Sequence, residues 1–329
     1  MSDILFSIII PTYNSAKFIK RAVDSILIQE FDSNEILIID DGSTDNTKEV
    51  VDDMVKGANC ITYIYQENQG PGMARNLGIK CAQGKYLLFL DVDDTFEIDT
   101  LKCLNEHIKS NQFDLTCFGY KLYGQNKKLL SGLNYDSPPM ITDHILDLFE
   151  HGTIKNVIWN KLYYKAFLLE KKIQFEDLKI NEDALFIYEI LLNTKNIGFL
   201  NRALYNHISD NKSSFTNQFS ASHFDSTIIL LNKIKHRTTY EFDSLYDNAF
   251  KTYCLRVLSY LIFLSALSIK EKPKYKFCSN KIYESNIFKD LNKFNPLNIK
   301  FKLMLFFLKK PWLIWNLSLI FKKFNYTIQ

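Results

Sequence analysis

Four apolar, strand-like runs, each ending in a polar loop, constrain the fold of this chain more than any other feature. Between them apolar residues recur with helical spacing, and the runs cover residues 4–10, 35–39, 61–65 and 86–90. The first run is continuously apolar and rich in β-branched residues, as is typical of a strand buried on both faces. Residues 1 to about 120 are therefore predicted to form βαβ units of an open α/β sheet flanked by helices.

The loops after these runs are rich in aspartate, glycine and other turn residues. They comprise Pro11-Thr12-Tyr13-Asn14, residues 40–45, residues 66–72 and Asp91-Val92-Asp93-Asp94. Ligands of open α/β sheets bind outside the carboxyl ends of the strands, so the four loops should converge on one crevice. Asn14 is expected to cap the first helix and Ser43 or Thr44 the second, and a third helix is predicted over residues 73–83.

The later part of the chain has a mixed pattern. Two segments look like strands, residues 113–123 and 197–205, and three look like helices, residues 141–150, 161–171 and 183–192. Beyond Asn217 the pattern is mainly helical, without an internal repeat or a low-complexity linker. The predicted fold class is α/β, followed by a helical carboxyl-terminal region.

Asp91, Asp93 and Asp94 place three carboxylates within four residues at the end of the fourth run. Charges of one sign held so closely repel one another, so a divalent cation or ligand hydroxyl groups should share them. Mg²⁺ or Mn²⁺ could bind one of these carboxylates while phosphates and water complete its octahedron. A solvated turn is the alternative, whereas an EF-hand loop is excluded because its required sixth-position glycine is Phe96 here.

Two other loops could bind an anion and a nucleobase. The Gly70-Pro71-Gly72 turn leads into a helix whose amino terminus and first-turn Arg75 attract anions, although Arg75 could instead pair with a nearby aspartate. This turn matches the dinucleotide fingerprint only in part, since Arg75 stands at its last glycine position. Asp41 could accept a hydrogen bond from a base on which Tyr13 stacks, or it could belong to a capping loop only.

In combination, these segments resemble the family 2 glycosyltransferases of the GT-A fold. The resemblance rests on the order and spacing of Pro11-Thr12-Tyr13-Asn14, residues 40–45, residues 68–78 and Asp91-Val92-Asp93-Asp94. It is specific over residues 4–100. It extends more loosely to about residue 215 through residues 159–163 and Asn181-Glu182-Asp183, which look like segments of bacterial surface-polysaccharide members.

The resemblance implies an inverting transferase that uses a nucleotide-diphosphate sugar, a UDP-sugar by family habit, together with Mn²⁺ or Mg²⁺. The donor-binding residues that it implies are Pro11, Thr12, Tyr13, Asp41, Arg75, Asp91 and Asp93. The metal ligands that it implies are Asp93, Asp94 and His207, with the choice between the two aspartates open. A lone histidine such as His207 is more often structural than a ligand.

Asn181-Glu182-Asp183 matches the acidic segment that supplies the catalytic base in this family. Inverting transfer needs a carboxylate to remove the proton of the attacking hydroxyl group, so Asp183 is the predicted base. Glu182 is predicted to bind acceptor hydroxyls, and helix capping by both acids is the alternative. Trp159 and Lys161 are predicted to line the acceptor site, although an aromatic residue at such a position is more often part of the core.

These assignments predict a GT-A catalytic domain over residues 1–215 and a helical region over residues 216–329. Within the first, residues 1–100 would bind the donor and residues 101–215 a glycan or lipid-linked glycan acceptor of bacterial surface-polysaccharide synthesis. A nucleotidyltransferase is an alternative, but it would usually show a basic, glycine-rich signature that residues 10–14 lack. A non-catalytic sugar-nucleotide binder is disfavoured because the acidic residues are all present.

Composition and charge limit which partners and which cellular location are expected for the protein. A net charge of +3 on 329 residues argues against a nucleic-acid binder that works through overall charge. The six cysteines are dispersed, which suggests reduced thiols, and the amino terminus lacks the pattern of a secretory signal, so a cytoplasmic location is expected. Residues 257–269 form an uncharged apolar run too short to span a bilayer, and a buried helix is expected there.

The chain after Asp290 has no acidic residue but seven lysines. Residues 303–308 and 312–315 are apolar and aromatic, and the lysines bracket them. This pattern fits interfacial helices on an anionic membrane, and neither segment is long enough to cross it. Peripheral attachment to the inner face of the cytoplasmic membrane is therefore expected; a helical pair packed on the catalytic domain or in a dimer is the alternative.

Overall fold

The computed structural model describes residues 4–124, 128–135, 143–209, 220–238, 244–294, 296 and 299–323. The chain forms two compact units. The first comprises residues 1–142, 156–177 and 182–211, and the second residues 143–155, 178–181 and 212–329. The predicted boundary at residue 215 lies outside the described residues. The chain enters the second unit twice before that point, so the two units are not consecutive in sequence.

The first unit opens with alternating strands and helices. These are β1 (Phe6–Thr12), α1 (Ile19–Leu27), β2 (Asn34–Asp41), α2 (Thr47–Gly57), β3 (Ile61–Gln66), α3 (Pro71–Cys81) and β4 (Tyr86–Phe89). β1 runs parallel to β2 and β4, and β2 runs parallel to β3. The four predicted strands and the predicted third helix are confirmed, and their ends lie within two residues of the expected ones.

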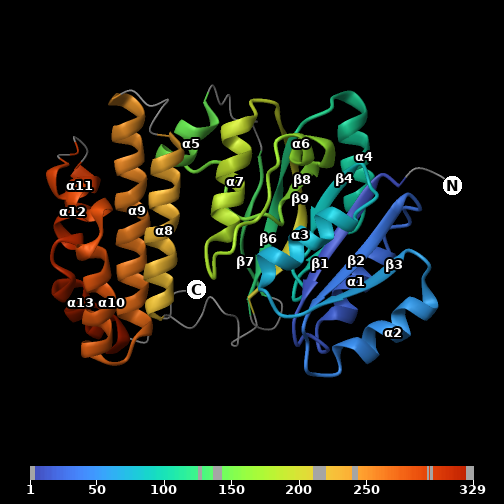
Figure 1. Ribbon diagram of the computed structural model, residues 1–329, viewed down its shortest axis with the longest axis horizontal. Helices are drawn as coiled ribbons and strands as arrows, with labels where there is room; N and C mark the ends of the chain where they lie inside the picture. The colour runs from blue at the N-terminus through green and yellow to red at the C-terminus, as the bar shows by residue number, and fades with distance from the viewer. Residues whose placement is uncertain are drawn as a thin grey trace. The chain divides into compact units, whose positions relative to one another are not determined.

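The rest of the first unit completes a mixed sheet. Its elements are β5 (Thr95–Phe96), α4 (Thr100–Ser110), β6 (Leu115–Tyr123), β7 (Leu129–Leu133), β8 (Lys161–Tyr164), α6 (Lys165–Glu170), α7 (Glu182–Asn193) and β9 (Ile197–Ile208). Within the described residues the sheet has nine strands in the order β3-β2-β1-β4-β8-β6-β9-β5, with β7 paired to β6 (Figure 1). β8 runs antiparallel to β4 and β6, so the run of parallel strands that begins at β3 ends at β4, and β6 and β9 form a second parallel pair.

The predicted helix over residues 161–171 is wrong in its first part. Residues Lys161–Tyr164 form β8 in the middle of the sheet, and the helix α6 begins only at Lys165. Leu162 and Tyr163 are buried, and β8 pairs with β4 on one side and β6 on the other. A strand in the middle of a sheet that is covered on both faces needs apolar residues at successive positions, and these two residues supply them. The segments predicted as residues 113–123, 183–192 and 197–205 are confirmed as β6, α7 and β9.

The loop-capping expectations are corrected as well. The side chain of Asn14, which has φ of 49°, accepts the backbone N–H groups of Thr44 at 2.7 Å and Asp45 at 3.2 Å. It therefore ties the loop after β1 to the loop after β2 instead of capping α1. Asp45, rather than Ser43 or Thr44, accepts the backbone N–H of Thr47 at the start of α2, at 3.0 Å.

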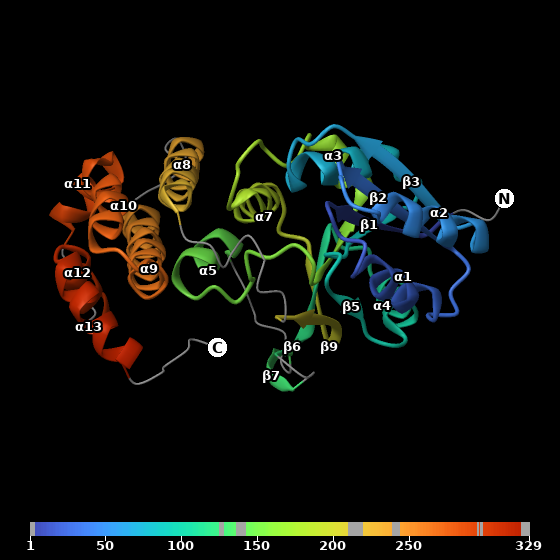
Figure 2. The same cartoon turned by 90° about the horizontal axis from the view of Figure 1, so that it is seen from below.

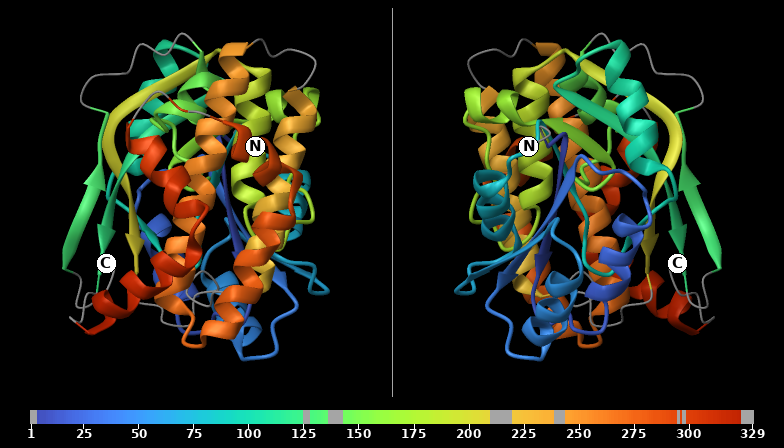
Figure 3. Two further views of the ribbon diagram at one scale, coloured as in Figure 1. Left: turned by 90° about the vertical axis from the view of Figure 1, so that its left-hand side faces the viewer. Right: turned by 90° about the vertical axis from the view of Figure 1, so that its right-hand side faces the viewer.

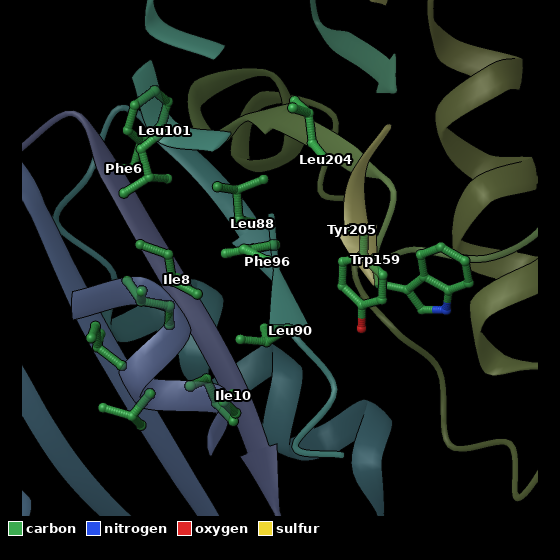
Figure 4. Close-up of a cluster of buried hydrophobic side chains, with 14 of the residues drawn as sticks. Phe6, Ile8, Ile10, Leu88, Leu90, Phe96, Leu101, Trp159, Leu204 and Tyr205 are labelled. Carbon is green, nitrogen blue, oxygen red and sulfur yellow. The ribbon is translucent and has the colours of Figure 1, made fainter. Parts of the chain in front are cut away.

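The main core of the first unit lies between one face of the sheet and the helices α1, α2 and α4. Phe6, Ile8 and Ile10 alternate along β1 and point into this core, where Leu88 of β4 meets them (Figure 4). Figure 2 shows α3 on the opposite face of the sheet from α1 and α4. That opposite face, reached by Ile9 and Phe89, supports the site described below.

The second unit is helical. It contains α5 (His144–Glu150), α8 (Ala221–Thr238), α9 (Ser244–Ser268), α10 (Lys272–Glu284), α11 (Asn286–Lys293), α12 (Ile299–Leu308) and α13 (Pro311–Lys323). α9 contacts each of the other helices in this unit, and the left view of Figure 3 looks onto the orange and red helices of this part of the chain. The predicted helix over residues 141–150 begins at His144, and residues 141–142 lie outside the described part.

α9 contains the apolar run expected to be a buried helix. By length and composition, residues Leu245–Ser268 are the one stretch of the described chain that could cross a membrane, and half of its most apolar window is buried. Leu258, Ile262 and Ala266 are buried, whereas Tyr260 is exposed. The core helix of a soluble helical bundle has the same length, composition and one-sided burial.

Candidate active site

Hydrogen bonds hold the loops at the carboxyl ends of the first strands together. Beside the Asn14 contacts, the Asp41 carboxylate accepts the backbone N–H groups of Gln69 and Gly70, each at 2.8 Å, and the Gln66 side chain at 2.7 Å. Gly70 has φ of +91°, in the region that favours glycine. These contacts confirm that the loops after β1, β2 and β3 converge, and they show that Asp41 fixes the Gly70-Pro71-Gly72 turn.

The predicted donor-binding residues of the first loop differ in exposure. Tyr13 is 51% exposed, which leaves its ring accessible to a ligand. Thr12 is buried, and its hydroxyl group donates to the carbonyl oxygen of Ile10 at 3.4 Å. Pro11 lies partly buried within β1. Of this loop, Tyr13 has the accessibility that stacking on a base requires.

Arg75 lies at the centre of an acidic cluster. Its guanidinium group contacts Asp91 at 3.2 Å, Glu182 at 2.9 Å and Asp183 at 3.0 Å, although the side chain is only 6% exposed. Burial lowers the pKa of Arg75, but Asp183, Asp91 and Glu182 outweigh it and hold the pKa above its usual range. Arg75 therefore joins the end of β4 to the start of α7, which are remote in sequence.

The two acids at the start of α7 have unequal environments. Asp183 is the more exposed, at 27% of its side chain against 11% for Glu182. Burial raises the pKa of Asp183 to about 8; Arg75 acts against this shift, and Glu182 and Asp91 add to it. A carboxylate with a raised pKa beside an accessible surface has the properties of a general base.

Contacts from α3 position this acidic cluster. The side-chain amide of Asn76 accepts the backbone N–H of Phe175 and donates to its carbonyl oxygen, both at 2.8 Å. A Cβ at Gly72 would approach Phe175 to 3.2 Å, and one at Gly78 would approach a side-chain methyl group of Ile9 to 2.4 Å. α3 thus packs tightly against β1 on one side and against the segment before α7 on the other.

Asp94 is fully buried and serves as an internal acceptor. Its carboxylate accepts the Tyr205 hydroxyl group at 2.6 Å and the Ile208 backbone N–H at 2.7 Å, and it lies 3.0 Å from Nδ1 of His207. Burial raises the pKa of Asp94, while the His207 and Tyr205 contacts act in the opposite direction. Asp94 has no exposed surface with which to meet a ligand.

His207 is partly exposed beside the aspartates. Burial lowers the pKa of His207, but the hydrogen bond with Asp94 and the charges of Asp94, Asp91 and Asp93 raise it above its usual value overall. Because Nδ1 faces Asp94, the other ring nitrogen, Nε2, is the one available to a ligand. Asp93 is only partly buried, and its backbone carbonyl oxygen accepts the Arg21 guanidinium group.

Trp159 and Lys161 are core residues, which corrects their assignment to acceptor binding. The Trp159 ring stacks on Tyr205 at 4.5 Å and on His207 at 5.4 Å between ring centres. Figure 4 shows Trp159 beside Tyr205 in the buried cluster. Lys161 is fully buried, and its ammonium group donates to the Val157 carbonyl and to the Asn160 side chain. Lys161 is enclosed because β8 lies inside the sheet, and Trp159, in the turn before β8, is enclosed by the rings of Tyr120, Tyr205 and His207.

The residues near the end of β4 could supply only part of the coordination of a divalent cation. Asp93 and His207 offer a carboxylate oxygen and an imidazole nitrogen, which suit Mn²⁺. Among the described residues no group of three or more histidine, cysteine, aspartate or glutamate side chains could hold a metal by itself. So few protein ligands are typical of a cation that a nucleotide diphosphate also coordinates.

Sequence reasoning missed two residues that organise the site, Tyr205 and Asn76. Asn76 belongs to the matched segment of residues 68–78 but carried no role, because its partner, Phe175, is 99 residues away. Tyr205 was expected only as the end of a strand. Its hydroxyl group bridges the acidic segment, since it donates to Asp94 and accepts the Asp91 backbone N–H at 3.2 Å.

Comparisons with known proteins identify the family of this chain. Residues 7–170 match the family model described as glycosyl transferase family 2. The chain is 30% identical over 212 residues to the glycosyltransferase GlyA of Streptococcus pneumoniae, which covers 62% of this chain and 30% of GlyA. It is 32% identical over 205 residues to the poly(ribitol-phosphate) beta-N-acetylglucosaminyltransferase TarS of Staphylococcus aureus, which covers 61% of this chain and 35% of TarS. The matches thus span about a third of these relatives.

A solved structure has the same fold. Residues 1–349 of S. aureus TarS, in complex with UDP-GlcNAc, align with a TM-score of 0.69 and 22% identity over 99% of this chain and 93% of that one. This likeness confirms the predicted GT-A fold, a mixed sheet flanked by helices with a helical carboxyl-terminal region. The sequence match and the fold agree, and the chain belongs to glycosyltransferase family 2.

Proposed function

We propose that this protein is an inverting glycosyltransferase that moves a sugar from a UDP-sugar to a hydroxyl group of a glycan acceptor. The observation that carries the proposal is the bridge through Arg75, which brings Asp183 into one cluster with Asp91. The proposed base and a proposed donor carboxylate therefore share one site. The TarS complexes with UDP and UDP-GlcNAc support a uridine nucleotide as the donor carrier.

The donor would lie over the loops at the carboxyl ends of β1 and β2. Tyr13 would stack on the base, and Asp41, which already fixes the Gly70 turn, would accept a base N–H from the same edge. Asp91 would accept a hydroxyl group of the ribose or the sugar. Arg75 would act on the donor through Asp91, because three carboxylates already surround its guanidinium group.

The transfer step assigns the proton to Asp183. As the acceptor oxygen attacks the anomeric carbon, its proton passes to the Asp183 carboxylate, and the bond from that carbon to the diphosphate oxygen breaks with its electron pair. The attack comes from the side opposite the leaving group, so the configuration inverts. Glu182 would keep Arg75 in place and help bind the acceptor hydroxyl group.

Of the two candidate aspartates, we propose Asp93 as the metal ligand. Asp94 is enclosed, accepts two hydrogen bonds and lies against Nδ1 of His207, so it would orient His207 by fixing which ring nitrogen faces outward. Bound Mn²⁺ or Mg²⁺ would neutralise the charge that develops on the leaving diphosphate. A solved mannosyltransferase from Pyrobaculum calidifontis with the same fold, at a TM-score of 0.53 and 13% identity over 94% of this chain and 86% of that one, is complexed with GDP-Man and Mn²⁺.

The names of the relatives suggest the sugar and acceptor to test first. TarS of S. aureus is named as a poly(ribitol-phosphate) beta-N-acetylglucosaminyltransferase. We therefore propose UDP-GlcNAc or a UDP-hexose as donor and a bacterial surface glycan, free or lipid-linked, as acceptor. A nucleotidyltransferase is the second candidate, and its product distinguishes it because it would release pyrophosphate instead of UDP.

The test is product analysis with UDP-sugars, Mn²⁺ and surface-glycan acceptors. UDP and a glycoside of inverted configuration are expected, with loss of turnover in EDTA and its return with added Mn²⁺. Asp183→Asn should abolish turnover, by about 10³-fold or more, while UDP binding remains. Asp53→Asn, which changes an exposed aspartate of α2, is the matched control. Near-normal turnover of Asp183→Asn would exclude Asp183 as base, and pyrophosphate release would exclude glycosyl transfer.

A further inference from the structure

The last two helices of the second unit expose an apolar face. α12 exposes Ile299, Leu303 and Phe306, which follow one another at helical spacing, and α13 exposes Trp312 and Leu319, seven residues apart. We call these five side chains the α12–α13 face. Leu303 and Trp312 are 52% and 55% exposed. The outward side of a helix in a soluble protein is ordinarily polar, so an exposed apolar face of this kind indicates an interaction surface.

The other side of both helices is already occupied. Leu305 and Leu308 of α12 and Ile314 and Trp315 of α13 are buried. Both helices contact α9, and the Ser318 hydroxyl group donates to the Ala266 carbonyl oxygen of α9 at 2.9 Å. Figure 2 shows α12 and α13, in red, along one side of α9. The α12–α13 face therefore lies on the side of these helices that points away from α9.

Lysines flank this face. Lys300, Lys302, Lys309 and Lys310 are exposed on α12 and just after it, and the Lys310 ammonium group lies 4.6 Å from the centre of the Phe306 ring. No acidic residue follows Asp290 in the sequence. The seven lysines after Asp290 exceed the net charge of +3 of the whole chain, so the preceding residues carry a net negative charge. Positive charge is thus concentrated in the segment that bears the apolar face.

Charge and shape together define the partner. An anionic bilayer offers phosphates at the surface for ammonium groups and an apolar layer just below for aromatic and aliphatic side chains. Lysine side chains can lay their carbon chains along that layer while the charged ends stay among the head groups. α12 and α13 have 10 and 13 residues, about 15 and 20 Å at 1.5 Å per residue, and are too short to cross a bilayer of about 30 Å.

We propose that the α12–α13 face binds the surface of an anionic lipid bilayer. Leu303, Phe306 and Trp312 enter the boundary between head groups and acyl chains, and the four exposed lysines contact lipid phosphates. This binding is independent of the transfer reaction proposed above. The two helices attach the protein to the membrane surface without crossing the bilayer.

The test is co-sedimentation of the full chain with vesicles of phosphatidylcholine alone or with one quarter phosphatidylglycerol. Binding to the anionic vesicles is expected to be at least about tenfold stronger and to weaken at 0.5 M salt. Replacing the four lysines, K300Q/K302Q/K309Q/K310Q, should weaken it by about 100-fold or more, since each lysine near an anionic surface contributes about fivefold. The apolar variant L303S/F306S/W312S should lose at least about tenfold.

Two matched variants control for charge and for exposed aromatics. K80Q/K102Q/K109Q/K172Q removes four exposed lysines of the first unit. Phe277→Ser removes an exposed ring on α10 that also has a lysine, Lys281, over it at 5.6 Å. Both should bind within about twofold of the unchanged protein, and circular dichroism should confirm that every variant is folded.

Three outcomes would overturn the proposal. The first is equal binding to neutral and anionic vesicles, or none to either. The second is a loss in the control lysine variant as large as that in the α12 variant. The third is a dimer in light scattering that L303S/F306S/W312S dissociates while vesicle binding is unchanged, because the face would then belong to a second copy of the chain.

Discussion

At the scale of single residues, Arg75 links the two halves of the proposed reaction. A guanidinium group can donate to several carboxylates at fixed angles, whereas an ammonium group is a single compact charge. Here one nitrogen contacts Glu182 and Asp183 and another contacts Asp91. The distance between donor carboxylate and base therefore depends on the planar shape of this side chain as well as on its charge.

Replacing Arg75 by alanine should destabilise the fold strongly. The change leaves three partly buried carboxylates without their counter-charge, and breaking a buried ion pair costs about 3–5 kcal/mol. Arg75→Lys keeps the charge and should remain folded, but with kcat lowered at least about tenfold because Asp183 loses its fixed position. Urea unfolding and steady-state kinetics measure the two effects. Wild-type stability in Arg75→Ala would show that the cluster is not held by this residue.

The raised pKa of Asp183 predicts the shape of the pH profile. A general base must be unprotonated, so kcat/KM should rise with pH through a pKa well above the usual carboxyl value, near 8 in the free protein. Glu182 is a negative neighbour that raises this pKa. Glu182→Gln should therefore move the rising limb to lower pH, whatever its effect on the maximum rate. A limb that stays in place, or moves to higher pH, would contradict the assignment.

At the scale of elements, α3 acts as a spacer between the sheet and the start of α7. Gly78 allows close packing on Ile9 of β1, and Asn76 holds the backbone of Phe175 on the far side. The ring of Phe175 then stacks on Phe186 of α7 at 4.0 Å between centres. Through these contacts α3 sets where the acidic residues of α7 lie.

Asn76→Ala should cost about 1–3 kcal/mol of folding free energy, because it leaves a backbone donor and acceptor of Phe175 without their partner. It should also lower kcat, since the segment that leads to Asp183 loses its attachment. Asn193→Ala removes a single exposed hydrogen bond to the Glu189 carbonyl oxygen and is the control, expected within about 0.5 kcal/mol. Equal unfolding midpoints in urea for the two variants would argue against the spacer role.

The local sequence pattern predicted the strands and helices better than it predicted which side chains meet in the folded protein. The strands of the parallel part were predictable because continuous apolar runs bounded by turn residues have few alternatives. β8 was not, since a short run such as Lys161–Tyr164 resembles the start of a helix, and the burial of Lys161 follows from that strand. The burial of Trp159 depends on Tyr120 and Tyr205, which are remote in sequence. The site's motifs were visible, but the pairing of Arg75 with acids more than 100 residues away arises only in the folded chain.

At the scale of the whole molecule, each of the two units is built from three segments that are not consecutive in the chain. The expectation from sequence was a catalytic domain ending at residue 215, yet residues 143–155 and 178–181 belong to the second unit. α5 packs there: the Phe149 ring lies 5.6 Å from Phe250 and 5.4 Å from Tyr253 of α9. The Arg256 side chain also donates to the Glu150 carbonyl oxygen at 2.7 Å.

Deleting residues 212–329 should therefore not leave an independently stable catalytic domain. α5 would lose its partners on α9 and expose Ile145, Leu148 and Phe149, which are buried in the full chain. Exposed apolar surface of this kind favours association and dye binding. We expect the shortened chain to aggregate or bind a hydrophobic dye, whereas Phe149→Ala in the full chain should remain soluble with a loss of about 3–5 kcal/mol. A monomeric fragment of residues 1–211 that unfolds cooperatively, within a few degrees of the full chain, would restore the simpler division at residue 215.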